Sequence, residues 1–240
     1  MLVTYSDLLS EGLLLFLTFF GAVLVALVAG ISFHECCHAV VADRLGDRTP
    51  RAMGRISLNP LRHLEPVGTF FMLLVGFGWG KPVMVNPNRL RNGPEAGRAM
   101  VAAAGPLSNL LLAAVASIPI NLDLAPWRSP FLIVRTSGWE TADYAGLFLT
   151  SLVIFNVILA VFNLLPIAPL DGFAVAVGLL PRDLGRSLAR LEPYGPAILM
   201  LLLILPFVSR GQVSVLHEVM SPLINGLTEL FSGGDARALG

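Results

Sequence analysis

The sequence has few charged residues and shows no excess of either sign. Only 13% of its 240 residues are Asp, Glu, Lys or Arg, compared with roughly 25% in ordinary soluble domains. Sixteen basic and sixteen acidic residues give a formal net charge of zero, so nothing in the overall charge favours a nucleic-acid partner. With 55% hydrophobic residues, the composition predicts an integral membrane protein instead of a soluble one.

Cysteines and N-terminal basic residues are also scarce. The only two cysteines are the neighbours Cys36 and Cys37, which excludes an ordinary disulfide framework. No Lys or Arg precedes the first apolar run, so the N-terminal segment lacks the basic region of a cleaved signal peptide. We therefore expect the first apolar run to stay in the membrane as a helix.

Apolar runs recur along the chain and predict membrane-inserted helices, and those of about 20 residues or more are long enough to cross a bilayer. The expected helices cover Leu8 to about Asp43, Ala99–Ile120, Tyr144–Leu165, Pro196–Val208 and, more weakly, the amphipathic stretch Val213–Phe231. The run from Ala102 to Gly105 consists of small residues, which let membrane helices approach closely. The sequence thus predicts an all-α polytopic membrane protein with four to six transmembrane helices.

A shorter apolar segment, residues 67–80, is only fourteen residues long, which is short for a spanning helix. Arginines precede it, and Lys81 and further arginines follow it. Because basic flanks favour the cytoplasmic side, we expect a re-entrant element that dips into the membrane and returns, although a glycine-rich spanning helix is the alternative interpretation. Residues 51–58 and 82–86 look extended and predict small strands beside it, although ordinary loops would explain the same pattern.

The residues that carry chemistry lie at the end of the first apolar run. His34, Glu35 and His38 form an H-E-x-x-H pattern. On a helix the two histidines point from one face, as two imidazole ligands of one zinc ion do, and Glu35 beside them is a candidate base. Two packed core histidines would explain the pair alone. The cysteines between them turn away from the histidine line and favour apolar packing.

A catalytic zinc usually has three protein ligands and keeps a fourth position for water, so one ligand is missing from this pattern. Asp171 is the strongest candidate, because it follows an apolar span broken by prolines, and an acid at membrane depth is costly without a partner. Gly172 beside it permits close backbone approach. With this ligand set, zinc would lower the pKa of its bound water to roughly 7, and Glu35 would accept the proton of that water.

Taken together, three blocks of sequence resemble the site-2 proteases, a family of intramembrane zinc metalloproteases. The blocks are His34–His38, Ala104–Asn109 and Asn163–Gly172. The last block is similar to the family pattern N-x-x-P-x-P-x-L-D-G, with Ala168 at the position of its second proline. Further similarity over Gly54–Val83 indicates the short prokaryotic branch of the family. The resemblance covers residues from about 30 to 180, and we see no inserted PDZ-like segment.

The resemblance implies that His34, His38 and Asp171 bind one zinc ion per chain and that Glu35 is the catalytic base. It implies hydrolysis of a peptide bond within or near a transmembrane segment of a membrane-protein substrate, as in regulated intramembrane proteolysis. The expected partners are this substrate and the lipid bilayer, with no nucleic acid. The basic loop after the first helix predicts a site near the cytoplasmic side, in what we expect to be a prokaryotic cell membrane.

From this resemblance we expect the whole chain, residues 1–240, to form a single membrane-embedded metalloprotease domain. Its core covers about residues 8–180, and its C-terminal helices lie within 194–231.

Three further residues are candidates for substrate binding or for stabilising an oxyanion. The resemblance implies that Asn109 and Asn163 lie near the site, where such a donor can be worth roughly 100- to 1,000-fold in rate. Hydrogen bonding between helices would satisfy Asn109 equally well. His63 is a candidate for the same site, and an ordinary cytoplasmic loop residue is an equally good interpretation.

Two other functions stay open on the sequence alone. A membrane carrier or a metal or ion transporter would also use intramembrane acids, histidines and broken helices. Such a protein would need inverted repeats or a polar row along several spans, and neither is visible in this sequence. A non-catalytic relative that only sequesters membrane helices would have no use for an intact set of ligands and base.

Overall fold

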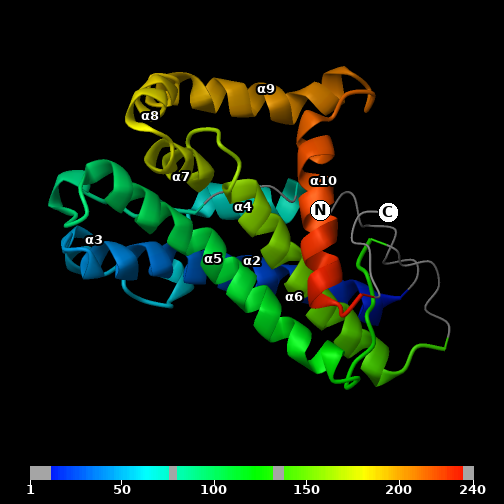
Figure 1. Ribbon diagram of the computed structural model, residues 1–240. Coiled ribbons are helices and arrows are strands. Elements are labelled where there is room, and N and C mark those ends of the chain that lie inside the picture. Colours follow the sequence, from blue (N-terminus) through cyan, green and yellow to red (C-terminus); the bar gives the residue numbers. More distant parts are fainter. Residues whose placement is uncertain (1–11, 76–79, 132–137, 235–240) are drawn as a thin grey trace.

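The computed structural model describes residues 12–75, 80–131 and 138–234 of the chain. Within these ranges the regular structure is helical (Figure 1). The α-helices are α2 (Leu13–Arg44), α3 (Thr49–Ala52), α4 (Pro66–Val75), α5 (Pro94–Asn121), α6 (Thr141–Asn163), α7 (Asp171–Leu179), α8 (Arg182–Ala189), α9 (Gly195–Val208) and α10 (Val215–Phe231). Short 3-10 turns are η1 (Pro60–Arg62), η2 (Pro87–Arg89) and η3 (Glu192–Tyr194). The predicted all-α class is confirmed.

Four segments of the described chain are long and apolar enough to cross a membrane. They are Leu13–Arg44, Pro94–Asn121, Thr141–Asn163 and Arg182–Val208. The first three are the single helices α2, α5 and α6, whereas the fourth consists of α8, η3 and α9 in succession. Four is the lower end of the predicted range of four to six transmembrane helices. Helix α10, at 17 residues, is not among the four.

The three long helices α2, α5 and α6 pack against one another and form the centre of the molecule (Figure 1). Phe19 of α2 and Leu147 of α6 belong to one buried apolar cluster. Ala113 of α5, Val157 of α6 and Ile224 of α10 belong to a second. Because α6 contributes to both clusters, it fixes the positions of α2 and α5 relative to each other.

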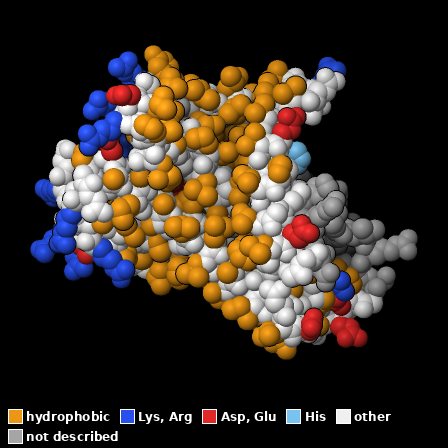
Figure 2. All heavy atoms as spheres, viewed as in Figure 1, with side chains coloured by type: hydrophobic (Ala, Val, Ile, Leu, Met, Phe, Trp, Pro, Cys, Tyr) orange, Lys and Arg blue, Asp and Glu red, His pale blue; other side chains and the backbone are white. Residues whose placement is uncertain are grey.

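Large apolar side chains cover much of the outer surface. Figure 2 shows them spread across the middle of the molecule, whereas Lys and Arg side chains gather at the end where α3 and α8 lie. Examples of strongly exposed apolar residues are Leu107 and Leu111 on α5 and Leu201 and Phe207 on α9. A soluble protein rarely exposes such a continuous apolar surface, so this face fits contact with lipid.

The segment expected to be re-entrant contains α4, which has ten residues and is therefore about 15 Å long. This length is about half of the hydrocarbon thickness of roughly 30 Å. Leu64 before α4 forms an antiparallel bridge with Gly80 after it, and the Lys81 N–H donates to the His63 carbonyl at 2.7 Å. The two ends of the segment therefore lie side by side, as a re-entrant element requires. Residues 76–79 lie outside the described residues.

The small strands expected near this element do not form in the described part of the chain, where the Leu64–Gly80 bridge is the only β-type pairing. Residues 51 and 52 belong to α3, and residues 82–86 have no ladder partner. Apart from these two helical residues, the alternative interpretation of both segments as ordinary loops is therefore the correct one.

Candidate metal centre

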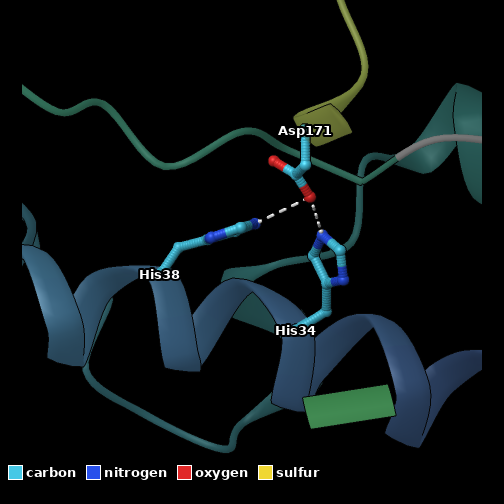
Figure 3. A group of neighbouring side chains, drawn as sticks. All are labelled: His34, His38 and Asp171. Atoms are coloured by element: carbon cyan, nitrogen blue, oxygen red, sulfur yellow. Dashed lines mark ion pairs between the residues drawn. The ribbon is translucent and has the colours of Figure 1, made fainter. Parts of the chain in front are cut away.

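Helix α2 carries both histidines of the H-E-x-x-H pattern on one face. It continues without a break from Leu13 to Arg44, so His34 and His38 are one turn apart and their rings meet edge to face with centroids 4.5 Å apart. Each histidine is only 7% exposed. Figure 3 shows both rings directed toward the carboxylate of Asp171.

Asp171 arrives from the other side as the first residue of α7. Helix α6 ends at Asn163, and Pro166 and Pro169 in the following turn cannot continue a helix. Gly172 then packs against the end of α6, where a Cβ would lie only 2.1 Å from the Leu164 carbonyl oxygen. A glycine is therefore required for the chain to turn back and place Asp171 over α2.

The three side chains have the spacing of ligands around a single metal ion. The Oδ2 atom of Asp171 lies 2.9 Å from Nε2 of His34 and 3.3 Å from Nε2 of His38. The ligand atoms all lie within 4.8 Å of one another. Atoms bound to tetrahedral zinc at about 2.0–2.1 Å are themselves roughly 3.3 Å apart. The structure thus brings together the three residues that the sequence singles out as a ligand set.

The hydrogen-bond partner of Nδ1 in each ring shows which tautomer of the imidazole is present. Nδ1 of His34 lies 2.8 Å from Oδ1 of Asn109, and Nδ1 of His38 lies 2.7 Å from the Val101 carbonyl oxygen. Since both oxygens can only accept, each Nδ1 carries the hydrogen and donates. In a neutral imidazole Nε2 then has a free lone pair, so both lone pairs face Asp171.

Asp171 Oδ2 is buried and accepts no hydrogen bond from the described residues. Two nitrogen lone pairs and a carboxylate oxygen thus converge without a donor among them. A divalent cation would satisfy all three atoms at once, and two imidazoles with one carboxylate form a ligand set that suits zinc. The residues present therefore fit this metal.

Gly105 of α5 closes a third side of the centre. A Cβ at this position would lie 2.5 Å from both Cε1 of His34 and Nε2 of His38. The sequence singles out Gly105 as part of a run of small residues and of the block Ala104–Asn109, without assigning it a contact. The structure shows that this run lets α5 approach the two rings themselves.

Glu35 is half-buried and belongs to the same turn of α2 as His34. A Cβ on Gly80, the residue at which the described chain resumes after α4, would lie 3.8 Å from Oε1 of Glu35. The Glu35 carboxylate makes no hydrogen bond or ion pair with other described residues. It therefore has free capacity to accept a proton.

Asn109 is fully buried and lies directly behind His34. Its Nδ2 group donates to the Gly30 carbonyl oxygen at 3.1 Å and to Oδ1 of Asn156 at 3.1 Å. Sequence reasoning missed Asn156. The sequence does contain a signal for this residue, because its amide lies in the middle of the apolar span 144–165. A polar side chain needs a partner there.

The other two candidates have hydrogen-bond partners away from the three converging side chains. Asn163 donates from Nδ2 to the Leu159 carbonyl of its own helix at 2.9 Å. His63 is fully buried and donates from Nε2 to the Ser57 carbonyl at 2.6 Å. Their predicted roles toward a substrate or an oxyanion stay predictions.

Apolar spans around a centre of two histidines and an aspartate, with a neighbouring glutamate, fit a membrane-embedded metal-dependent enzyme. Comparison with known proteins identifies its class and its metal. The chain is 32% identical over 208 residues to a Bacillus subtilis (strain 168) protein named as a candidate zinc metalloprotease, YwhC. This match covers 87% of the present chain and 90% of the relative.

Two mycobacterial relatives named as candidate zinc metalloproteases, both called Rip2, are also similar. The protein from Mycolicibacterium smegmatis is 29% identical over 197 residues, and that from Mycobacterium tuberculosis strain H37Rv is 32% identical over 198 residues. Each match covers 78% of this chain and 70% of the relative. No family model and no solved structure matches significantly. The chain belongs to the site-2 protease family of zinc metalloproteases.

Proposed function

We propose that this protein is an intramembrane protease that hydrolyses a peptide bond within or near a transmembrane segment of a membrane-protein substrate. The observation that carries the proposal is the convergence of His34, His38 and Asp171 between helices long and apolar enough to span a bilayer. Glu35 in the same motif supplies a base. A metal centre among apolar spans suits a substrate that is itself embedded in the membrane.

In the proposed reaction, His34, His38 and Asp171 would hold the zinc ion. When bound there, zinc would supply Lewis-acid chemistry, lowering the pKa of a water molecule to roughly 7 and polarising the carbonyl of the scissile peptide. Glu35 accepts a proton from the water as its oxygen bonds to the carbonyl carbon, and then delivers that proton to the amide nitrogen as the C–N bond breaks. The products are a carboxylic acid and an amine, and Glu35 returns to its carboxylate form.

A transmembrane substrate must be unwound locally before its backbone can reach the metal. The segment that follows Gly80, beside Glu35, supports binding of such an unwound stretch, because residues 81–86 belong to no helix or strand. Within the described chain, the backbone N–H groups of Val83, Met84 and Val85 have no hydrogen-bond partner. Free backbone groups of this kind can pair with an extended peptide as an added strand does.

We further propose that the site lies near the cytoplasmic side of a prokaryotic cell membrane. His38 is six residues from the end of α2 at Arg44, which corresponds to about 9 Å along the helix. Basic side chains gather at the end of the molecule where α3 follows α2 (Figure 2). Basic loops favour the cytoplasmic side of a membrane, and this preference supports the proposed orientation.

The decisive experiment uses purified full-length protein in liposomes with a panel of single-span substrates. Wild-type protein should contain one zinc ion and release two fragments. The Glu35→Gln variant should keep its zinc but cleave at least about 100-fold more slowly, since general base catalysis contributes roughly 10²- to 10⁴-fold. Absence of zinc, or cleavage by Glu35→Gln at the wild-type rate, would refute the proposal.

The same liposomes discriminate the protease from a carrier or transporter. Uptake of metal ions or protons that persists in the Glu35→Gln variant, without any cleavage by wild type, would favour the transporter. Zinc-dependent cleavage without uptake would support the protease.

A further inference from the structure

Two buried amides connect three helices directly behind the metal centre. Asn109 comes from α5 and is 0% exposed, and Asn156 comes from α6 and is 3% exposed. Together they reach His34 and the Gly30 carbonyl on α2. A polar group within apolar spans is costly unless it has a partner, so this connected set requires an explanation.

The direction of each hydrogen bond in the set is determined. Asn156 donates from Nδ2 to the Leu152 carbonyl at 2.9 Å, which turns its Oδ1 toward Asn109. Asn109 donates from Nδ2 to that Oδ1 and to the Gly30 carbonyl, each at 3.1 Å. The orientation of the Asn109 amide is thereby fixed, and its Oδ1 can only accept from Nδ1 of His34.

This arrangement argues against a direct role of Asn109 toward the substrate. An amide Nδ2 has two hydrogens, and both are engaged, one with Gly30 and one with Asn156. The side chain is also fully buried. No N–H group of Asn109 is left to stabilise an oxyanion.

We propose that Asn109 and Asn156 are positioning residues that act through His34. Asn109 fixes the orientation of the His34 ring and stabilises the tautomer of His34 that is protonated on Nδ1. In that tautomer the Nε2 lone pair faces Asp171. Asn156 holds Asn109 in the orientation that allows this. Outer hydrogen bonds of this kind orient a metal-binding histidine and raise its basicity. The inference rests on the proposed function only in taking His34 as a zinc ligand.

The two histidines differ in how they are held. Nδ1 of His38 donates to a backbone carbonyl, that of Val101, which side-chain substitutions leave in place. His34 depends on side chains from two other helices. Correct packing of α6 against α5 is therefore coupled to the zinc affinity of a ligand on α2.

The test measures zinc affinity of purified full-length protein by competition with a chromophoric chelator, without any substrate. Outer-shell substitutions typically weaken metal binding 10- to 100-fold. We expect a loss of about this size for Asn109→Leu and a smaller loss for Asn156→Leu, which acts one hydrogen bond further away. Asn109→Asp keeps an acceptor for His34 and should fall between wild type and Asn109→Leu.

Ser151→Ala is the matched control. Ser151 is a fully buried polar residue on α6, and its hydroxyl donates only to the Leu147 carbonyl of the same helix. This variant should bind zinc as wild type does. Nitrogen NMR of the metal-free protein adds a readout that a purely structural role would not change: the His34 signals should show the form protonated on Nδ1 in wild type and a mixture in Asn109→Leu.

Wild-type zinc affinity in both Asn109→Leu and Asn156→Leu would overturn the inference. If Asn109→Leu does not fold, Asn156→Leu decides the question. A folded Asn109→Leu variant that binds zinc normally but no longer cleaves would also overturn it, because the amide would then act on the substrate. Failure of the proposed protease function is distinguishable from failure of this inference. In that case wild type would cleave no substrate, but the Asn109 variant would still bind zinc more weakly than wild type.

Discussion

Replacement of Gly105 by alanine tests the geometry of the metal centre with a single carbon atom. The new Cβ would lie 2.5 Å from Cε1 of His34, 2.5 Å from Nε2 of His38 and 2.6 Å from Nε2 of His34. Ordinary contacts between such atoms are about 3.5–4.0 Å. The rings or the helix must therefore move by roughly 1 Å.

Neither ring can give way easily, because each is held from behind by a hydrogen bond, to Asn109 or to Val101. Overpacking of this kind costs about 1–3 kcal/mol. Metal–ligand distances tolerate only about 0.2 Å, so the strain should appear mainly in metal binding. Since 1.4 kcal/mol corresponds to tenfold, we expect zinc affinity to fall about 5- to 150-fold. In the metal-free protein, alanine favours the helix by about 1 kcal/mol relative to glycine, so the loss of folding stability should be smaller than the strain alone would cause.

The assay compares zinc affinity by chelator competition with thermal unfolding in detergent, each with and without zinc. Gly21→Ala on α2 is the matched control, because a Cβ there meets no atom within 4 Å. Zinc should raise the unfolding temperature of wild type and of Gly21→Ala, and much less that of Gly105→Ala. Equal zinc affinity in Gly105→Ala and Gly21→Ala would show that the described approach of α5 to the rings is wrong.

Two further predictions concern the amides behind the centre and the loop after α2. Gly30→Ala would place a Cβ 2.8 Å from Oδ1 of Asn156, so chelator competition should show weaker zinc binding than in Gly21→Ala; equal affinity would contradict this. At Asp47, burial opposes ionisation, but hydrogen bonds led by that from the Thr49 hydroxyl outweigh it and lower the pKa. The folded pKa thus lies below the unfolded value of about 3.9, so the stabilisation is present above that value and lost as pH falls through the folded pKa. Thermal unfolding measured against pH should show that Asp47→Asn does not lose this stability in acid. The same pH dependence of unfolding in Asp47→Asn and wild type would refute the stabilising role of the Asp47 carboxylate.

The sequence alone determined the class of the fold and the three candidate ligands of the metal centre. Composition and the length of apolar runs required membrane helices, because backbone groups in lipid must bond internally. The spacing of His34 and His38 placed both on one face, since helical periodicity is a local property. Asp171 followed from the cost of an acid at membrane depth, and the structure brings its carboxylate to the two rings.

Tertiary structure decided which groups surround these residues. Whether a buried amide such as Asn109 faces a substrate or a histidine depends on how three helices are rotated against one another, and no local pattern encodes that rotation. For the same reason Asn156 and the contact of Gly105 with the rings could not be read from spacing. The pairing of Leu64 with Gly80 likewise joins residues whose proximity depends on the path of the chain between them.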